Sequence, residues 1–329
     1  MELKLSLNHE SFKRLNQYVL ETKEWIQASA ASVLIIKDGE IVNEQYYGSH
    51  DHTEHSRKVD RHSQFNIASI RKTYLGFAIS LALYERKIKS LDDCITNYIS
   101  NQDGNVLKGT TIRHLLTHTH GLYNLEKRLF EAGTDWKYNN AGVNLLIKLV
   151  QTVFQKSLAE VIRDNILIPC QLTETGWRKL KKECLVWVDE SYNDEQGNEA
   201  NLFVSTRELG YWGYLHLTQG DVQGNQIVPQ AVFEQVANII SPELIDKQLP
   251  KHGFFWWVQD EPSLSSELGI QLPKGSFQSL GIFGCAVLVI PRHNVVAVRM
   301  YNQIESNPQG YHYLHDIQSF GNLVLQECF

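Results

Sequence analysis

The pattern of apolar and polar positions changes its period twice along the chain. Across residues 31–47, two runs rich in β-branched and aromatic residues flank Asp38-Gly39, a dipeptide that is a strong hairpin signal. From residue 67 onward the apolar positions recur at helical spacing: Ile70, Tyr74, Leu75, Ala78, Ile79, Ala82 and Leu83. The pattern predicts a β-hairpin near the N-terminus, followed by a long helix that begins close to Ser69.

Helical spacing dominates to about residue 210, and strand-like runs return in the last third of the chain. The further elements that we expect are helices over 111–117, 141–154 and 313–327 and strands over 254–258, 284–290 and 295–301. Together they predict an α/β (α+β) fold, in which an antiparallel sheet formed from both chain termini is flanked by helices and carries an inserted all-helical region. We expect residues 1–75 and 211–329 to form the α/β sandwich region and 76–210 the mainly helical region.

Composition narrows the class of protein. The chain has 329 residues, 43% of them hydrophobic and 21% charged, which is enough for a sizeable buried core. A net charge of −6 without a dense Lys/Arg run argues against a nucleic-acid surface. The first residues lack the apolar stretch of a secretory signal, and no window approaches the roughly 20 apolar residues of a membrane span. We therefore expect a soluble, cytoplasmic protein whose partners include neither nucleic acid nor membrane.

A possible nucleophile stands at the start of the predicted long helix. In Ser69-Ile70-Arg71-Lys72 a hydroxyl and an amine are three residues apart, so that both project from one helix face. A serine needs such a neighbour to become nucleophilic, and the positive end of the helix dipole stabilises negative charge that develops beside it. An S-x-x-K string alone is weak evidence, because about one is expected by chance in a chain of this length.

A second signal lies just before the predicted helix 141–154. Tyr138 and Asn140 are two positions apart, so both can point together from a loop. A phenol near a lysine ammonium can accept the Ser69 proton and return it to a leaving group, and the amide of Asn140 can orient both partners and the substrate. Without a catalytic role, Tyr138 would be an ordinary half-buried aromatic residue. The pairing with Ser69 and Lys72 favours the catalytic role.

These two motifs resemble the S-x-x-K and Y-x-N elements of the serine β-lactamase-like and penicillin-binding-protein superfamily, which contains class C β-lactamases, D-alanyl-D-alanine carboxypeptidases and family VIII esterases. Residues 111–122, TIRHLLTHTHGL, are similar to the superfamily segment T-I-R-H-L-L-T-H-T-S-G-L. Further similar stretches follow in the same order, so that the resemblance covers roughly residues 30–302. It implies an α/β sandwich that carries an all-helical region, with the active site between the two.

The third superfamily motif, K-T-G or H-x-G on a strand at the edge of the site, aligns best with Ser279-Leu280-Gly281. A lysine or histidine at the first position helps to hold a substrate carboxylate, whereas Ser279 offers only a neutral hydrogen bond. β-Lactam and D-Ala-D-Ala substrates are therefore disfavoured. By similarity, the backbone N–H of Ile282 would complete an oxyanion hole with the N–H of Ser69.

The combined interpretation is a serine hydrolase that forms an acyl-enzyme on a small ester, amide or lactam, with an esterase-like substrate preferred. The alternatives are a D-Ala-D-Ala carboxypeptidase or β-lactamase, and a non-catalytic binding protein on the same fold. No metal or organic cofactor is implied, and the expected partner is a small-molecule acyl substrate. The sequence does not identify the acyl group or the leaving group of the substrate, nor the oligomeric state of the protein. It also does not decide whether Lys72 or Tyr138 accepts the first proton.

Histidines and aromatic residues supply further candidates. His114 and His118 are four positions apart and could share a metal on one helix face, but the resemblance gives them structural roles at a helix end and places His120 where a small serine is usual. Core packing is the default interpretation for the aromatic residues near the predicted cleft: Tyr123, Trp136, Trp212 and the run 254–257. Any of them that lined the site would favour an apolar or aromatic acyl group.

Overall fold

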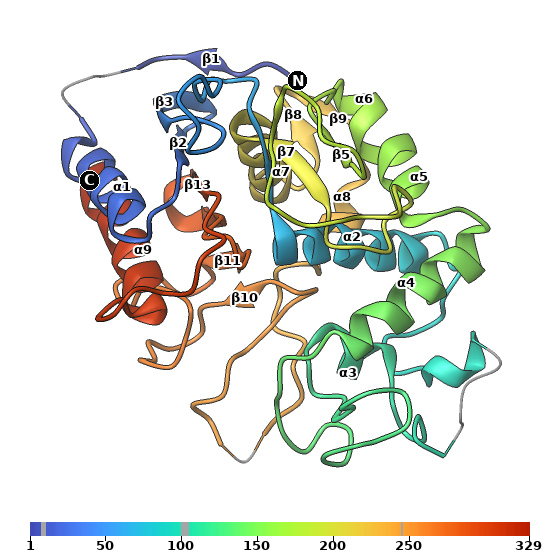
Figure 1. Cartoon of the computed structure of the whole chain (residues 1–329). Helices are drawn as coiled ribbons and strands as arrows, with labels where there is room; N and C mark the ends of the chain where they lie inside the picture. The colour runs from blue at the N-terminus through green and yellow to red at the C-terminus, as the bar shows by residue number, and fades with distance from the viewer. Residues whose placement is uncertain (8–10, 100–104, 245) are drawn as a thin grey trace.

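A seven-stranded sheet forms the centre of the fold in the computed structural model, which describes residues 1–7, 11–99, 105–244 and 246–329 (Figure 1). Its strands lie in the order β1-β3-β2-β13-β12-β11-β10, and neighbours are antiparallel except for β1, which runs parallel to β3. The bounds are β1 Lys4–Leu5, β2 Ala30–Lys37, β3 Glu40–Gly48, β10 Trp257–Val258, β11 Phe277–Leu280, β12 Ala286–Ile290 and β13 Val295–Tyr301. The predicted sheet built from both chain termini is confirmed.

Helices cover both faces of this sheet. Helices α1 (Lys13–Trp25) and α9 (Tyr313–Cys328) lie side by side on one face, and α7 (Thr206–Leu217) lies on the other (Figure 1). Successive side chains of a strand point to opposite faces. In β13, Val295 therefore packs with α1 and α9, whereas Val296 packs with α7. None of the described helices is long and apolar enough to cross a lipid bilayer.

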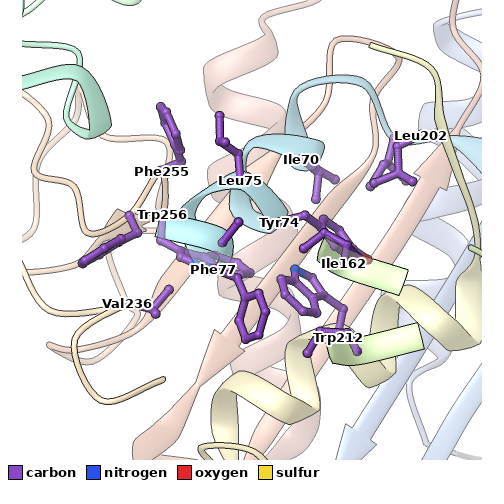
Figure 2. Packing of buried hydrophobic residues seen from close by; sticks show 14 of the residues in the cluster. Ile70, Tyr74, Leu75, Phe77, Ile162, Leu202, Trp212, Val236, Phe255 and Trp256 are labelled. Carbon is purple, nitrogen blue, oxygen red and sulfur yellow. The ribbon is translucent and has the colours of Figure 1, made fainter. Parts of the chain in front are cut away.

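Helix α2 (Arg71–Tyr84) is buried on nearly all sides, as expected for a helix whose apolar residues surround its axis. Figure 2 shows Tyr74 and Phe77 of α2 packed in one cluster with Trp212 of α7. The rings of Tyr74 and Trp212 stack with their centroids 4.0 Å apart, and the indole N–H of Trp212 donates to Thr73 Oγ1 at 2.9 Å. This packing holds α2 in place, and with it the turn η1 (Ala68–Ile70), which precedes α2 and carries Ser69.

A second sheet of four short strands lies next to the start of α2. Its order is β5 (Thr175–Trp177), β7 (Leu202–Ser205), β4 (Gln64–Asn66) and β6 (Leu185–Val186). The segment 76–210 thus contributes three strands in addition to its helices, and the boundaries proposed for the two regions stay a prediction. The remaining elements are η1 Ala68–Ile70, η2 Ile95–Asn97, α3 Ile112–Leu116, α4 Ala141–Phe154, α5 Leu158–Ile162, η3 Arg163–Leu167, α6 Ile168–Cys170, β8 Asp221–Val222, β9 Asn225–Gln226, α8 Gln230–Phe233 and η4 Pro291–His293.

The local predictions near the sheet have mixed outcomes. The hairpin of β2 and β3 is confirmed, and its turn residues Asp38 and Gly39 have φ of 51° and 80°, the left-handed conformation that a tight hairpin turn requires. The strand predicted over 254–258 is wrong for its first three residues, because only Trp257–Val258 pairs with β11. Phe255 has φ of 67° and packs into the core from irregular backbone.

A buried ion pair joins the sheet to α9. The guanidinium of Arg299 on β13 donates to both carboxylate oxygens of Asp316 at 2.9 and 2.6 Å, and the Arg299 residue is only 1% exposed. Replacing Asp316 with alanine is expected to lower the free energy of unfolding by about 3–5 kcal/mol, because Arg299 would stay buried without a counter-charge. Urea denaturation measures this change.

The matched control for Asp316→Ala is Glu40→Gln, which breaks the exposed pair between Lys4 and Glu40. This variant should keep the wild-type unfolding midpoint, since exposed ion pairs contribute little. Equal midpoints for both variants would contradict the importance of the buried pair.

Candidate active site

Ser69 lies in η1, the single helical turn between β4 and α2. The turn begins with Ala68, whose φ of 45° is unusual for a residue with a side chain. The carboxamide oxygen of Asn66 accepts from the Ala68 N–H at 2.8 Å, and the amide of Asn66 donates to the hydroxyl of Tyr192 at 2.7 Å. Asn66 therefore fixes the backbone that presents Ser69, although no sequence motif marked this residue.

The structure brings together Ser69, Lys72 and Tyr138, the three residues predicted to carry the chemistry. The ammonium of Lys72 donates to Ser69 Oγ at 2.8 Å and also to the hydroxyl of Tyr138. The Tyr138 hydroxyl in turn donates to Ser69 Oγ at 2.8 Å. Each of the three polar groups thus contacts the other two, so a proton can pass between any pair of them without an intervening group.

Burial changes the acidity of these groups in opposite directions. Lys72 is 4% exposed, and desolvation together with the nearby charge of Arg71 lowers its pKa to about 7. Burial of the phenol raises the pKa of Tyr138, while its hydrogen bond with Ser69 opposes this shift. Near neutral pH, a large fraction of Lys72 is therefore an uncharged amine, and Tyr138 keeps its proton.

The loop before α4 positions Tyr138 through its neighbour Asn139. The Asn139 side chain accepts from the Ala141 N–H at 2.7 Å and donates to the Tyr123 carbonyl at 3.1 Å. The predicted residue Asn140 is instead exposed, and its side chain does not cap α4. The role expected of Asn140 in orienting the catalytic groups and the substrate stays a prediction, whereas Asn139 holds the loop.

The end of β11 lies against the turn that carries Ser69. A Cβ atom on Gly281 would stand only 2.4 Å from the Ile67 carbonyl oxygen, so glycine permits this close approach. Ile282 is 82% exposed, and neither its N–H nor that of Ser69 donates a hydrogen bond within the described part of the chain. Both N–H groups are therefore free to bind a ligand. Ser279 is buried on β11 and does not line the cavity.

A cavity of about 660 Å³ contains Ser69 and Tyr138. Its other lining residues include five aromatic side chains, Trp136, Trp257, Phe283, Tyr311 and Tyr313, and four charged ones, Glu190, Glu267, Arg299 and Glu305. Of the aromatic residues singled out from the sequence, Trp136 and Trp257 line this cavity, whereas Trp212 and Phe254 belong to the core. The volume is that of a site for a small molecule.

Comparison with known proteins identifies the family of this chain. The family model named Beta-lactamase matches residues 16–318. The chain belongs to the β-lactamase family. An uncharacterized protein of Alkalihalophilus pseudofirmus is 42% identical over 318 residues, which cover 93% of this chain and 94% of that protein.

Two solved structures share the β-lactamase-family fold. A class C β-lactamase in complex with cefoxitin has a TM-score of 0.78 at 16% identity, covering 95% of this chain and 97% of that one. EstCE1, a hydrolase with promiscuous acyltransferase activity, has a TM-score of 0.73 at 17% identity, covering 94% of this chain and 97% of that one. The fold predicted from the resemblance is thereby confirmed.

Two of the histidines in this β-lactamase-family protein have structural contacts: His118 packs against Tyr138, and His114 caps a helix. The ring of His118 packs against that of Tyr138 with centroids 4.5 Å apart, and burial lowers the pKa of His118 well below its usual value. The ring nitrogen of His114 accepts from the N–H of Thr111 at the start of α3. Within the described residues, no group of three His, Cys, Asp or Glu side chains is arranged to hold a metal ion.

Proposed function

We propose that this protein is a serine hydrolase that acts through an acyl-enzyme on a small ester or amide. The observation that carries the proposal is the set of mutual hydrogen bonds among Ser69, Lys72 and Tyr138. Two of these residues, Ser69 and Tyr138, line a cavity of small-molecule size. A serine hydroxyl in contact with a lysine of lowered pKa and with a phenol has both a base and a proton donor at hand.

The proposed reaction begins when the uncharged amine of Lys72 takes the proton of the Ser69 hydroxyl. Ser69 Oγ then bonds to the substrate carbonyl carbon, and the carbonyl oxygen, now negative, accepts from the N–H groups of Ser69 and Ile282. Tyr138 donates its proton to the leaving oxygen or nitrogen and recovers one from Lys72. Water afterwards attacks the ester of Ser69 and releases the acid, which restores the hydroxyl.

The surroundings of the site favour an ester or amide over a β-lactam or a peptide with a free carboxylate. Ser279 carries no charge, and Arg299, the cation that lines the cavity, is already paired with Asp316. A substrate carboxylate would therefore lack a charged partner. The likeness to EstCE1, a hydrolase with promiscuous acyltransferase activity, supports a hydrolase that transfers acyl groups. The likeness to the class C β-lactamase in complex with cefoxitin keeps a β-lactamase as the second candidate.

Mass spectrometry of the intact protein tests this proposal. We expect a fluorophosphonate probe and a p-nitrophenyl ester each to add one mass increment, which peptide mapping places on Ser69. Heat-denatured protein is the control, because it contains the same serine without Lys72 and Tyr138 in contact. A stable adduct with a penicillin and none with the ester would favour the β-lactamase or carboxypeptidase alternative. No adduct with any reagent would favour a non-catalytic binding protein.

A further inference from the structure

Glu267 lines the cavity that holds Ser69, and its carboxylate has no cationic partner among the described residues. The Tyr313 hydroxyl donates to Glu267 Oε1, so its partner is a neutral phenol. The Glu267 carbonyl accepts from the Gln278 side chain at 2.6 Å, which ties the residue to β11. Burial raises the pKa of Glu267 to about 7, the direction expected of a carboxylate that lacks a counter-charge.

The cavity offers no free cation to neutralise Glu267. Among the described residues that line it, Arg299 is the sole cation, and both oxygens of Asp316 occupy its guanidinium. Lys72 and Arg71 are buried on α2 and do not line the cavity. The charge of Glu267 is therefore available to a ligand.

The walls of the cavity suit a cation as well. Trp136 and Trp257 line it with their ring centroids 5.7 Å apart, and Tyr311 and Tyr313 line it further. The faces of such rings attract an ammonium group through their quadrupoles, especially where water is excluded. A carboxylate among aromatic rings is a suitable environment for an organic ammonium ion.

We propose that Glu267 binds an ammonium group of the substrate, so that the ester or amide cleaved at Ser69 carries a positive charge. This inference rests on the proposed function, because it assigns a substrate class to the same cavity. Glu267, Ser69 and Tyr138 line the same cavity. One small molecule can therefore place its ammonium at Glu267 and its carbonyl at Ser69 within about 660 Å³.

Equilibrium binding of three unreactive ligands of similar size tests the inference: 2-phenylethylammonium, 2-phenylethanol and phenylacetate. Binding is followed at pH 8 by the fluorescence of the cavity tryptophans or by calorimetry. We expect the ammonium to bind wild type about 10- to 100-fold more tightly than the alcohol, the range for a hydrogen bond to a charged group, and phenylacetate to bind most weakly. Equal binding, or tightest binding of phenylacetate, would overturn the inference.

Two variants test whether Glu267 causes the tighter binding of the ammonium ligand. In Glu267→Gln the ratio of ammonium to alcohol affinity should fall towards one, and in Glu261→Gln, which changes an exposed carboxylate outside the cavity, it should stay at the wild-type value. If Glu267→Gln does not fold, Glu267→Asp replaces it: the shorter side chain withdraws the carboxylate from the cavity, so the ratio must fall below the wild-type value. A wild-type ratio in folded Glu267→Gln, or in folded Glu267→Asp, would refute the role of Glu267.

Ligand affinity tests the role of Glu267, and the mass adduct at Ser69 tests the proposed hydrolase. Because the two measurements are independent, each proposal can fail without the other. An adduct at Ser69 without an ammonium preference refutes the role of Glu267 alone. An ammonium preference without any adduct refutes the hydrolase and leaves Glu267 as a ligand-binding residue of a binding protein.

Discussion

Replacing Ser69 with alanine is expected to lower kcat/KM for a p-nitrophenyl ester by about 10⁴-fold or more, because the atom that would bond to the acyl group is removed. Lys72 and Tyr138 keep the hydrogen bond between them, so the rest of the site stays assembled. Steady-state hydrolysis measures the rate, and intact mass shows whether the acyl adduct is lost together with it.

The matched control for Ser69→Ala is Ser80→Ala. Ser80 lies on α2, the helix that follows Ser69, but its hydroxyl donates to the Val232 carbonyl at 2.6 Å, away from the cavity. Its loss should leave ester hydrolysis within a few-fold of wild type. A Ser69→Ala protein that hydrolyses the ester as fast as Ser80→Ala would show that Ser69 is not the nucleophile.

Long periodic segments made much of the fold predictable. The helix α2 and the strand β13 bury residues throughout their length, so their apolar periods are visible in the sequence. The four-stranded sheet was not predicted, because its strands are only two to four residues long and too short for alternation. Helix α1 was missed because two of its four buried residues are Thr22 and Lys23, which weaken the apolar stripe.

The candidate site was predictable where its residues are close in sequence. Ser69 and Lys72 share one turn of backbone, so their spacing alone places them together. Glu267 could not be found in this way, because it lies in irregular backbone and reaches the cavity through bonds to Tyr313 and Gln278. The role of Asn139 in holding the loop before α4 was missed for the same reason, since the chain direction within a loop is set by tertiary contacts.

The second large effect is expected at Lys72, and it decides which group accepts the first proton. Because burial and Arg71 lower the pKa of Lys72 to about 7, kcat/KM of wild type should rise with pH through about 7 and then reach a plateau as the amine loses its proton. Lys72→Arg keeps a positive charge but holds its proton at any usable pH. We expect it to lose about 10²- to 10⁴-fold in kcat/KM, the usual contribution of a general base.

Tyr138→Phe complements Lys72→Arg. Two esters with different leaving groups distinguish Tyr138 as the proton donor to the leaving group from Tyr138 as the base that takes the Ser69 proton. If Lys72 is the base and Tyr138 protonates the leaving group, Tyr138→Phe should slow an alkyl ester much more than a p-nitrophenyl ester, since p-nitrophenolate departs without a proton. Lys72→Arg should slow both esters alike. If instead Tyr138 takes the first proton, Tyr138→Phe will slow both esters equally, and Lys72→Arg will retain most of the rate, because a positive charge beside the phenol is then all that the reaction requires.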